Sequence, residues 1–151
     1  ISRLLDKIGN KGYIFKGWGV NAAATIAMYS PGTIYPYDSS ITLYAVWEAQ
    51  TFTVSYNANG GAGAPSSQTK IYGEALTLRI TIPTRDRYKF LGWSESATAT
   101  TPTYYAGGTY QKEASVTLYA VWEYINYDFS VSDLTASDIR CKAPSECWKR
   151  V

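Results

Sequence analysis

Several short stretches of the chain alternate between polar and apolar side chains with a period of two. They are residues 51–56, 76–82 and 116–122. In the last stretch, Leu118, Ala120 and Trp122 share one face, because successive side chains of a strand point to opposite sides. Such alternation over four to eight residues is typical of half-buried strands. The pattern therefore predicts a mainly β protein with little helix.

Stretches rich in Gly, Asn and Pro separate the predicted strands. Residues 59–65 predict a turn, because Gly and Asn tolerate a positive φ and Pro fixes its own φ. Gly107 and Gly108 mark another turn, and Pro83 ends the alternation before it. Residues 94–102 are rich in Ser, Thr and Ala and fit either a loop or a single helical turn. We expect four or five strands between residues 51 and 123.

The chain matches itself when Tyr13 is placed on Tyr88, and no gap is needed. Residues 13–18 then align with residues 88–93, and residues 40–48 align with residues 115–123. About half of the positions from 12 to 48 are identical to their partners. A match of this length within one chain indicates two copies of one structural unit.

The internal match divides the chain into three parts. Residues 1–49 are the C-terminal part of a first module, whose opening strand is missing because Ile1 aligns with Leu76. Residues 50–123 are a complete second module, and residues 124–151 are a tail that matches neither copy. We therefore predict small β modules arranged in tandem.

Each copy contains a Gly-Trp pair, Gly17-Trp18 or Gly92-Trp93. Such a Trp can serve as a ligand platform or as a core residue. We favour the core, because a small module has few residues with which to bury apolar area and one Trp supplies much of it. The predicted structural core comprises Trp18, Trp93, Trp47, Trp122, Phe15 and Phe90.

Three segments resemble the Listeria–Bacteroides repeat, the B-repeat of internalin-type surface proteins. They are Phe-Thr-Val-Ser-Tyr-Asn-Ala-Asn-Gly-Gly at 52–61, Tyr-Lys-Phe-Leu-Gly-Trp at 88–93 and Val-Thr-Leu-Tyr-Ala-Val-Trp at 116–122. Their order and spacing match the family over residues 51–123 and over the latter half of the module in residues 1–48. The resemblance implies compact β-grasp-like modules in tandem on extracellular or cell-surface proteins. It also implies a spacer or adhesive role without catalytic residues.

The composition offers little for chemistry. The chain has no His, which removes Ser-His-Asp and Cys-His arrangements and most zinc sites. We expect no enzyme activity, no catalytic residues, no metal and no cofactor, although a glycosidase-type pair among the scattered carboxylates stays formally open. The formal net charge of +2 gives no electrostatic reason to expect nucleic acid. No apolar run is long enough to span a bilayer.

The tail carries two further signals. Residues 124–132 alternate, which predicts a strand, and residues 133–140 fit a short helix. The apolar face of the predicted strand consists of Ile125, Tyr127, Phe129 and Val131. Cys141 and Cys147 predict a small disulfide loop if the protein is exported, as the resemblance implies, and two free thiols are the alternative.

Two features suggest an assembly hypothesis. The first module lacks its opening strand, and the tail carries a predicted strand that belongs to neither module. The tail strand of one copy can fill the gap in the next copy by strand addition, and such head-to-tail contacts give an open filament. The alternative is that the chain is a fragment. A third possibility is a virion or phage fibre or decoration protein built from the same modules.

A different class of function is a glycan- or protein-binding surface module. Tyrosine is amphipathic and suits stacking on sugars, so exposed Tyr residues are the candidates for such a surface. They are Tyr35, Tyr37, Tyr104 and Tyr105. Scattered surface Tyr on a β protein also needs no ligand. The expected partners are thus copies of the chain itself, or a surface protein or glycan.

Overall fold

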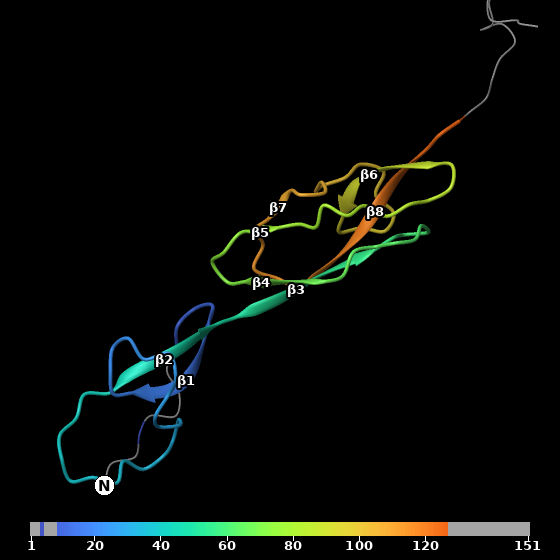
Figure 1. Ribbon diagram of the computed structural model, residues 1–151. Coiled ribbons are helices and arrows are strands. Elements are labelled where there is room, and N and C mark those ends of the chain that lie inside the picture. The colour runs from blue at the N-terminus through green and yellow to red at the C-terminus, as the bar shows by residue number, and fades with distance from the viewer. Residues whose placement is uncertain (1–3, 5–8, 127–151) are drawn as a thin grey trace, which may run out of the picture.

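A computed structural model describes residue 4 and residues 9–126. These residues contain no helix, and the expected mainly β fold is confirmed. The strands are β1 (Tyr13–Gly19), β2 (Tyr44–Ala49), β3 (Thr51–Asn57), β4 (Gln68–Ile71), β5 (Leu76–Thr77), β6 (Tyr88–Ser94), β7 (Thr109–Tyr110) and β8 (Val116–Tyr124). β1 and β2 make a first unit, and β3 to β8 make a second unit (Figure 1).

The second unit is built on a four-stranded sheet with the order β4-β3-β8-β6. The two central strands, β3 and β8, are parallel, while both outer pairs are antiparallel. β5 and β7 form a separate two-stranded pair. The β-grasp likeness implied by the family resemblance stays a prediction, because here a loop and not a helix follows β6.

Two details of the second unit differ from the sequence prediction. It has six strands where four or five were expected, because β4 is an additional edge strand. The alternating stretch 76–82 forms a ladder only over Leu76–Thr77, and Ile80 beyond it is 82% exposed. The alternation there was misleading, because the backbone bonds to the segment before β7 end at Arg79, whose carbonyl accepts from the N–H of Gly107.

The two hairpins of the chain have the same register. β1 pairs with β2 through Phe15–Trp47, Gly17–Val46 and Trp18–Ala45, with an irregularity between Phe15 and Gly17. β6 pairs with β8 through Phe90–Trp122, Gly92–Val121 and Trp93–Ala120, with an irregularity between Phe90 and Gly92. Each pair of the second hairpin is therefore the counterpart, under the internal sequence match, of a pair in the first.

The core of the second unit lies on one face of its sheet. β3 contributes Val54, β8 contributes Leu118 and Ala120, and β6 contributes Trp93; none of these side chains is accessible to solvent. The rest of the buried cluster comes from the β5 and β7 region, with Leu78 and Tyr110. Burial of this much apolar surface is the dominant favourable term in folding so small a unit.

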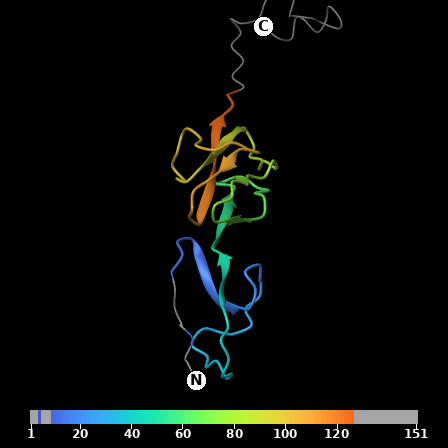
Figure 2. The same ribbon diagram turned by 90° about the vertical axis from the view of Figure 1, so that its left-hand side faces the viewer.

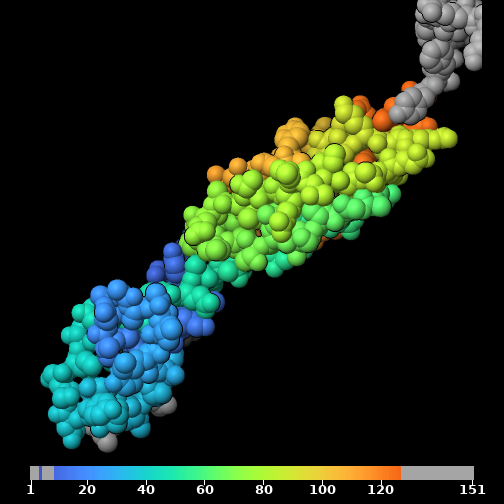
Figure 3. All heavy atoms as spheres, in the orientation of Figure 1, coloured from blue at the N-terminus to red at the C-terminus, as the bar shows by residue number. Residues whose placement is uncertain are grey.

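The two units follow one another end to end, so that the described part of the chain is elongated with a narrow waist (Figures 1 and 3). A single residue, Gln50, separates β2 from β3. The two strands continue in nearly the same direction across this residue, as a second view also shows (Figure 2).

The tail enters the described region only at its beginning. Ile125 follows β8 and donates its N–H to the carbonyl of Arg87 at 2.8 Å. The other residues of the predicted tail strand, Tyr127, Phe129 and Val131, lie outside the described residues, as do Cys141 and Cys147.

Candidate functional site

The two Gly-Trp pairs mark a place where a loop crosses the hairpin at close range. Trp93 exchanges backbone hydrogen bonds with Tyr104, and its carbonyl also accepts from Thr103 at 2.8 Å. Gly92 has a φ of 154°, and a Cβ there would lie 2.5 Å from the carbonyl oxygen of Tyr104. The glycine is therefore required by this crossing, because no side chain fits between the two backbones.

The first unit repeats the crossing with its own residues. Trp18 exchanges backbone hydrogen bonds with Tyr29, and its carbonyl accepts from Met28 at 2.8 Å. Gly17 has a φ of 130°, and a Cβ there would overlap the equivalent carbonyl, that of Tyr29. The Gly-Trp pair is thus a structural signature of the crossing in both units.

The aromatic cluster of the second unit completely buries one Trp, Trp93. The Trp93 ring contacts Phe90 at 5.0 Å and Tyr56 of β3 at 4.9 Å, both edge to face. Trp122 is half-buried, and its indole N–H donates to the carbonyls of Ala58 and Asn59 in the turn after β3. The segment from β3 to this turn therefore covers both Trp residues.

The first unit has the same cluster, and among its described residues no segment equivalent to β3 covers it. Phe15 lies 5.1 Å from Trp18 and 5.5 Å from Trp47, close to the corresponding spacings in the second unit. Trp18, Trp47 and Phe15 are all only half-buried. The predicted core residues thus lie together in each unit, but Trp93 alone among them is fully enclosed.

The candidate glycan-binding tyrosines divide into two kinds. Tyr37 and Tyr105 are 61% and 62% exposed, while Tyr35 and Tyr104 are half-buried. Tyr35 meets Tyr37 edge to face at 5.4 Å, so these rings offer no common flat surface for a sugar. Tyr104 donates its hydroxyl to Glu95 at 3.0 Å. Glycan binding stays a prediction.

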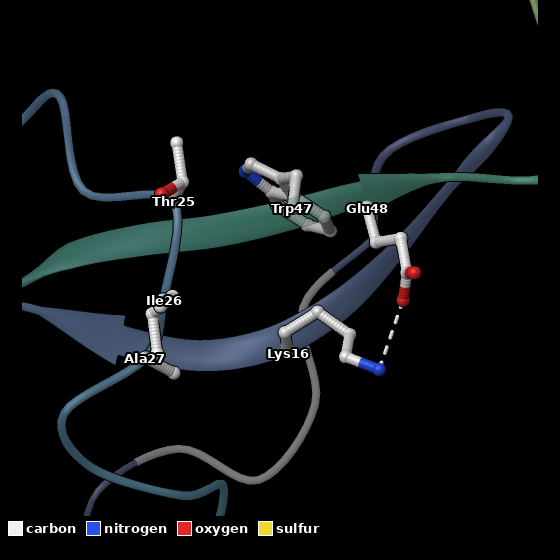
Figure 4. Close-up of a pocket in the computed structure, with 6 residues that line it drawn as sticks. All are labelled: Lys16, Thr25, Ile26, Ala27, Trp47 and Glu48. Atoms are coloured by element: carbon white, nitrogen blue, oxygen red, sulfur yellow. Dashed lines mark ion pairs between the residues drawn. The ribbon is translucent and has the colours of Figure 1, made fainter.

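A pocket of about 360 Å³ opens on the first unit beside β2 (Figure 4). It is lined by Lys16, Thr25, Ile26, Ala27, Trp47 and Glu48. Lys16 Nζ lies 2.9 Å from Glu48 Oε2, and both side chains are at least half exposed. Such an ion pair is screened by solvent and is worth little, so it adds only a polar rim to the pocket.

Charged groups in the second unit support structure. Lys70 on β4 is fully buried, and its ammonium donates to Glu113 at 3.0 Å and to the carbonyl of Ile71 at 2.8 Å. A hydrogen bond from Lys112 lowers the pKa of Glu95, and the same bond raises the pKa of Lys112. Within the described ranges, no three acidic, His or Cys side chains gather where a metal ion could bind.

Some of these residues were not found by sequence reasoning. The buried Lys70 gave no signal, because a Lys in a polar stretch predicts a solvated surface. Asn59 was expected only as a turn former, yet its side-chain amide donates to the carbonyls of Ala97 and Ala120. The internal sequence match did indicate the crossing loop, because it aligns Tyr29 with Tyr104 as well as the two Gly-Trp pairs.

The repeated geometry agrees with a family model. The model of the Listeria-Bacteroides repeat domain matches residues 2–46 and again residues 52–121. The chain belongs to this family. Its repeats are associated with surface-type proteins and are non-catalytic in general.

Two relatives come from Evansella cellulosilytica. A protein provisionally named a Gly-rich membrane protein is 29% identical over 129 residues, which is 85% of this chain and 14% of that protein. Another, provisionally named a membrane protein, is 32% identical over 121 residues, which is 80% of this chain and 17% of that protein. The chain thus spans less than a fifth of either relative.

No solved structure matches the chain. In the part of the chain that the structure describes, no helix is long and apolar enough to cross a membrane.

Proposed function

We propose that this chain is a stretch of an extracellular, non-enzymatic spacer, in which β modules joined end to end set a distance at a cell surface. We propose also that the boundary between the modules lies between Ala49 and Gln50, so that residues 1–49 belong to the first module, residues 50–123 to the second, and residues 124–151 to a separate tail. The family and its surface-type members support this role. The observation that carries it is the joint between the two units.

The joint is short and uses both backbone groups of Gln50. Its N–H donates to the carbonyl of Gly12 in the first unit at 2.9 Å, and its carbonyl accepts from Tyr72 in the second unit at 2.9 Å. The rings of Tyr13 and Tyr72 meet edge to face at 5.7 Å across the joint. Gly12 is buried with a φ of 81°, and a Cβ there would overlap the Tyr72 ring. A one-residue linker tied to both units holds them in one orientation, as a spacer requires.

The rigidity of the joint is the test of this proposal. Residual dipolar couplings measured for the whole chain give one alignment tensor for both units if they tumble together. We expect one tensor for the natural chain and two different tensors after insertion of Gly-Gly-Ser between Ala49 and Gln50. Tyr72→Ala should loosen the joint partly, while Tyr105→Ala, an exposed Tyr away from the joint, should leave it unchanged. Independent tumbling in the natural chain would contradict a spacer role.

A second candidate function is filament assembly by strand addition in trans, favoured by the outer edge of β2, which no described strand pairs. The donor would be the tail strand with Ile125, Tyr127, Phe129 and Val131. Sedimentation of the natural chain over a range of concentrations tests it: a ladder of species supports assembly, and a monomer at every concentration counts against it.

A further inference from the structure

The hairpins of the two units end in the same backbone geometry. In the first unit, the N–H of Gln50 donates to the carbonyl of Gly12 at 2.9 Å. In the second unit, the N–H of Ile125 donates to the carbonyl of Arg87 at 2.8 Å. The internal sequence match aligns these two bonds residue for residue. Each unit therefore presents an equivalent end, its exit face, made by residues 10–13 and 49–50 in the first unit and by residues 85–88 and 124–125 in the second.

The exit face of the first unit receives an aromatic ring from the second unit. The Tyr72 ring lies directly against the backbone of Gly12, where a Cβ would overlap it. The same ring meets Tyr13 edge to face at 5.7 Å. Ala49, which pairs with Tyr13 across the hairpin, contributes only a methyl group. The ring partner of Tyr13 therefore comes from the next unit, and two small residues flank it.

The exit face of the second unit carries large side chains at both of these places. Arg87 stands at the position of Gly12, and Tyr124 stands at the position of Ala49. Tyr124 pairs with Tyr88 across the hairpin, and the two rings meet edge to face at 5.3 Å. The guanidinium of Arg85 lies 3.8 Å from the centre of the Tyr88 ring. The second unit thus supplies from its own residues the contact that the first unit takes from its neighbour.

The side chain of Arg87 strains the backbone that carries it. Its φ of 62° is left-handed, like the φ of 81° at Gly12. Among the described residues, only Asn59 and Arg87 have a positive φ without being Gly, and Asn tolerates that region better. Gly would adopt it without strain, and such strain points to a role for the residue. Packing within the unit does not supply that role, because the Arg87 side chain is 69% exposed.

We propose that the exit face selects what can dock after each unit: Gly12 and Ala49 open it, whereas Arg87 and Tyr124 close it. An open exit face accepts a following module with an aromatic ring at the position of Tyr72. A closed one rejects such a module, because the Arg87 side chain leaves the backbone where the ring would lie. The second unit therefore closes a rigidly docked column at Ile125, whatever follows it along the chain.

The closed exit face has the character of an end cap. Residues 85–87 are Arg-Asp-Arg, so that the outer end of the second unit is charged. The counterparts in the first unit are Asn-Lys-Gly. In stacked repeats each unit contacts only its neighbours, and the terminal units carry a polar outer face. The selection rests on the proposed rigid joint at Gln50, which it extends to the choice of partner.

The first test transfers the closed exit face to the first unit of the whole chain. Gly12→Arg with Ala49→Tyr should abolish the NMR contacts between the Tyr13 and Tyr72 rings and give the two units different alignment tensors. Gly63→Arg is the matched control, because Gly63 has a similar φ of 76° but open space around it, in the turn after β3. The control should keep one tensor. One tensor in the double variant, with its hairpin contacts intact, would overturn the proposal.

The reciprocal test opens the exit face of the second unit and leaves the first unit unaltered. A further copy of residues 50–124 is inserted between Tyr124 and Ile125, and it alone is isotope-labelled. We expect this third unit to align independently of the first two, which are labelled in a parallel sample. With Arg87→Gly and Tyr124→Ala in the middle unit, all three should share one tensor. Docking without these substitutions, or independence despite them, would contradict the selection.

The outcomes separate this inference from the spacer proposal. Two tensors in the natural chain contradict the spacer role and the selection together. One tensor in the natural chain, with docking of the inserted unit onto the unaltered second unit, keeps the spacer role and removes the selection alone.

Discussion

The two units share one hairpin and one crossing loop but differ in what covers them. Both have the bulge before Gly-Trp and the loop that bonds to the Trp backbone. Trp93 is nevertheless completely buried, while Trp18 is half-buried. The hairpin and its crossing loop are therefore formed by residues that both units contain, and β3 is not needed for them. Enclosure of the core depends on β3, which pairs with β8 although the two strands lie at opposite ends of the second unit's sequence.

The largest difference between the units should appear when the Trp is removed. Trp93→Ala should destabilise the second unit by about 3–5 kcal/mol, the usual cost of deleting a buried aromatic side chain. Trp18→Ala should cost the first unit clearly less, because part of that ring is already in water. Urea unfolding followed by NMR signals specific to each unit measures both values. Equal costs would mean that the first core is as enclosed as the second.

The sequence predicts the positions of single strands better than the pairing between strands that are distant in sequence. The alternation at 51–56 and 116–122 located β3 and β8, and the internal match located the second hairpin. The parallel pairing of β3 with β8 was not predicted, because periodicity shows the face of a strand and not its neighbour. The edge strand β4 was missed for a related reason: its polar residues gave no signal, although Lys70 is buried.

The Gly-Trp crossing offers a second contrast, between two glycines of one unit. Gly92→Ala should destabilise the second unit by about 2–3 kcal/mol, because the new methyl group meets the Tyr104 carbonyl and the Pro102 side chain. Gly63→Ala should cost about 1 kcal/mol, since Gly63 has a φ of 76° but open space around it. Thermal unfolding of the two variants gives the difference. A similar loss for both would show that backbone conformation alone requires the glycine.

The indole N–H groups of Trp122 and of its counterpart Trp47 should give a smaller difference in stability. Trp122→Phe should cost about 1 kcal/mol, because the carbonyls of Ala58 and Asn59 lose their common donor. Trp47→Phe in the first unit should change stability less, because no described residue accepts from that N–H. Denaturant unfolding of both variants measures the contrast.

The smallest expected effect is a dependence of the stability of the second unit on pH. Glu95 accepts from Lys112 at 2.6 Å and from Tyr104, and the Lys112 bond above all lowers its pKa below the ordinary 4.5. The counterparts of Glu95 and Lys112 in the first unit are Val20 and Tyr37, which form no ion pair.

A carboxyl whose pKa is lower in the folded state stabilises the fold above its unfolded pKa, and that contribution is lost as pH falls through the folded pKa. The second unit should therefore lose stability below about pH 4.5. Glu95→Gln should reduce the dependence of the unfolding free energy on pH without abolishing it. Glu113 accounts for the remainder: burial opposes its ionisation, but bonds from the Gly73 N–H and Lys70 leave its pKa lowered as well. Unit-specific unfolding between pH 3 and pH 7 measures the slopes, and an unchanged slope in Glu95→Gln would assign the acid sensitivity to Glu113 alone.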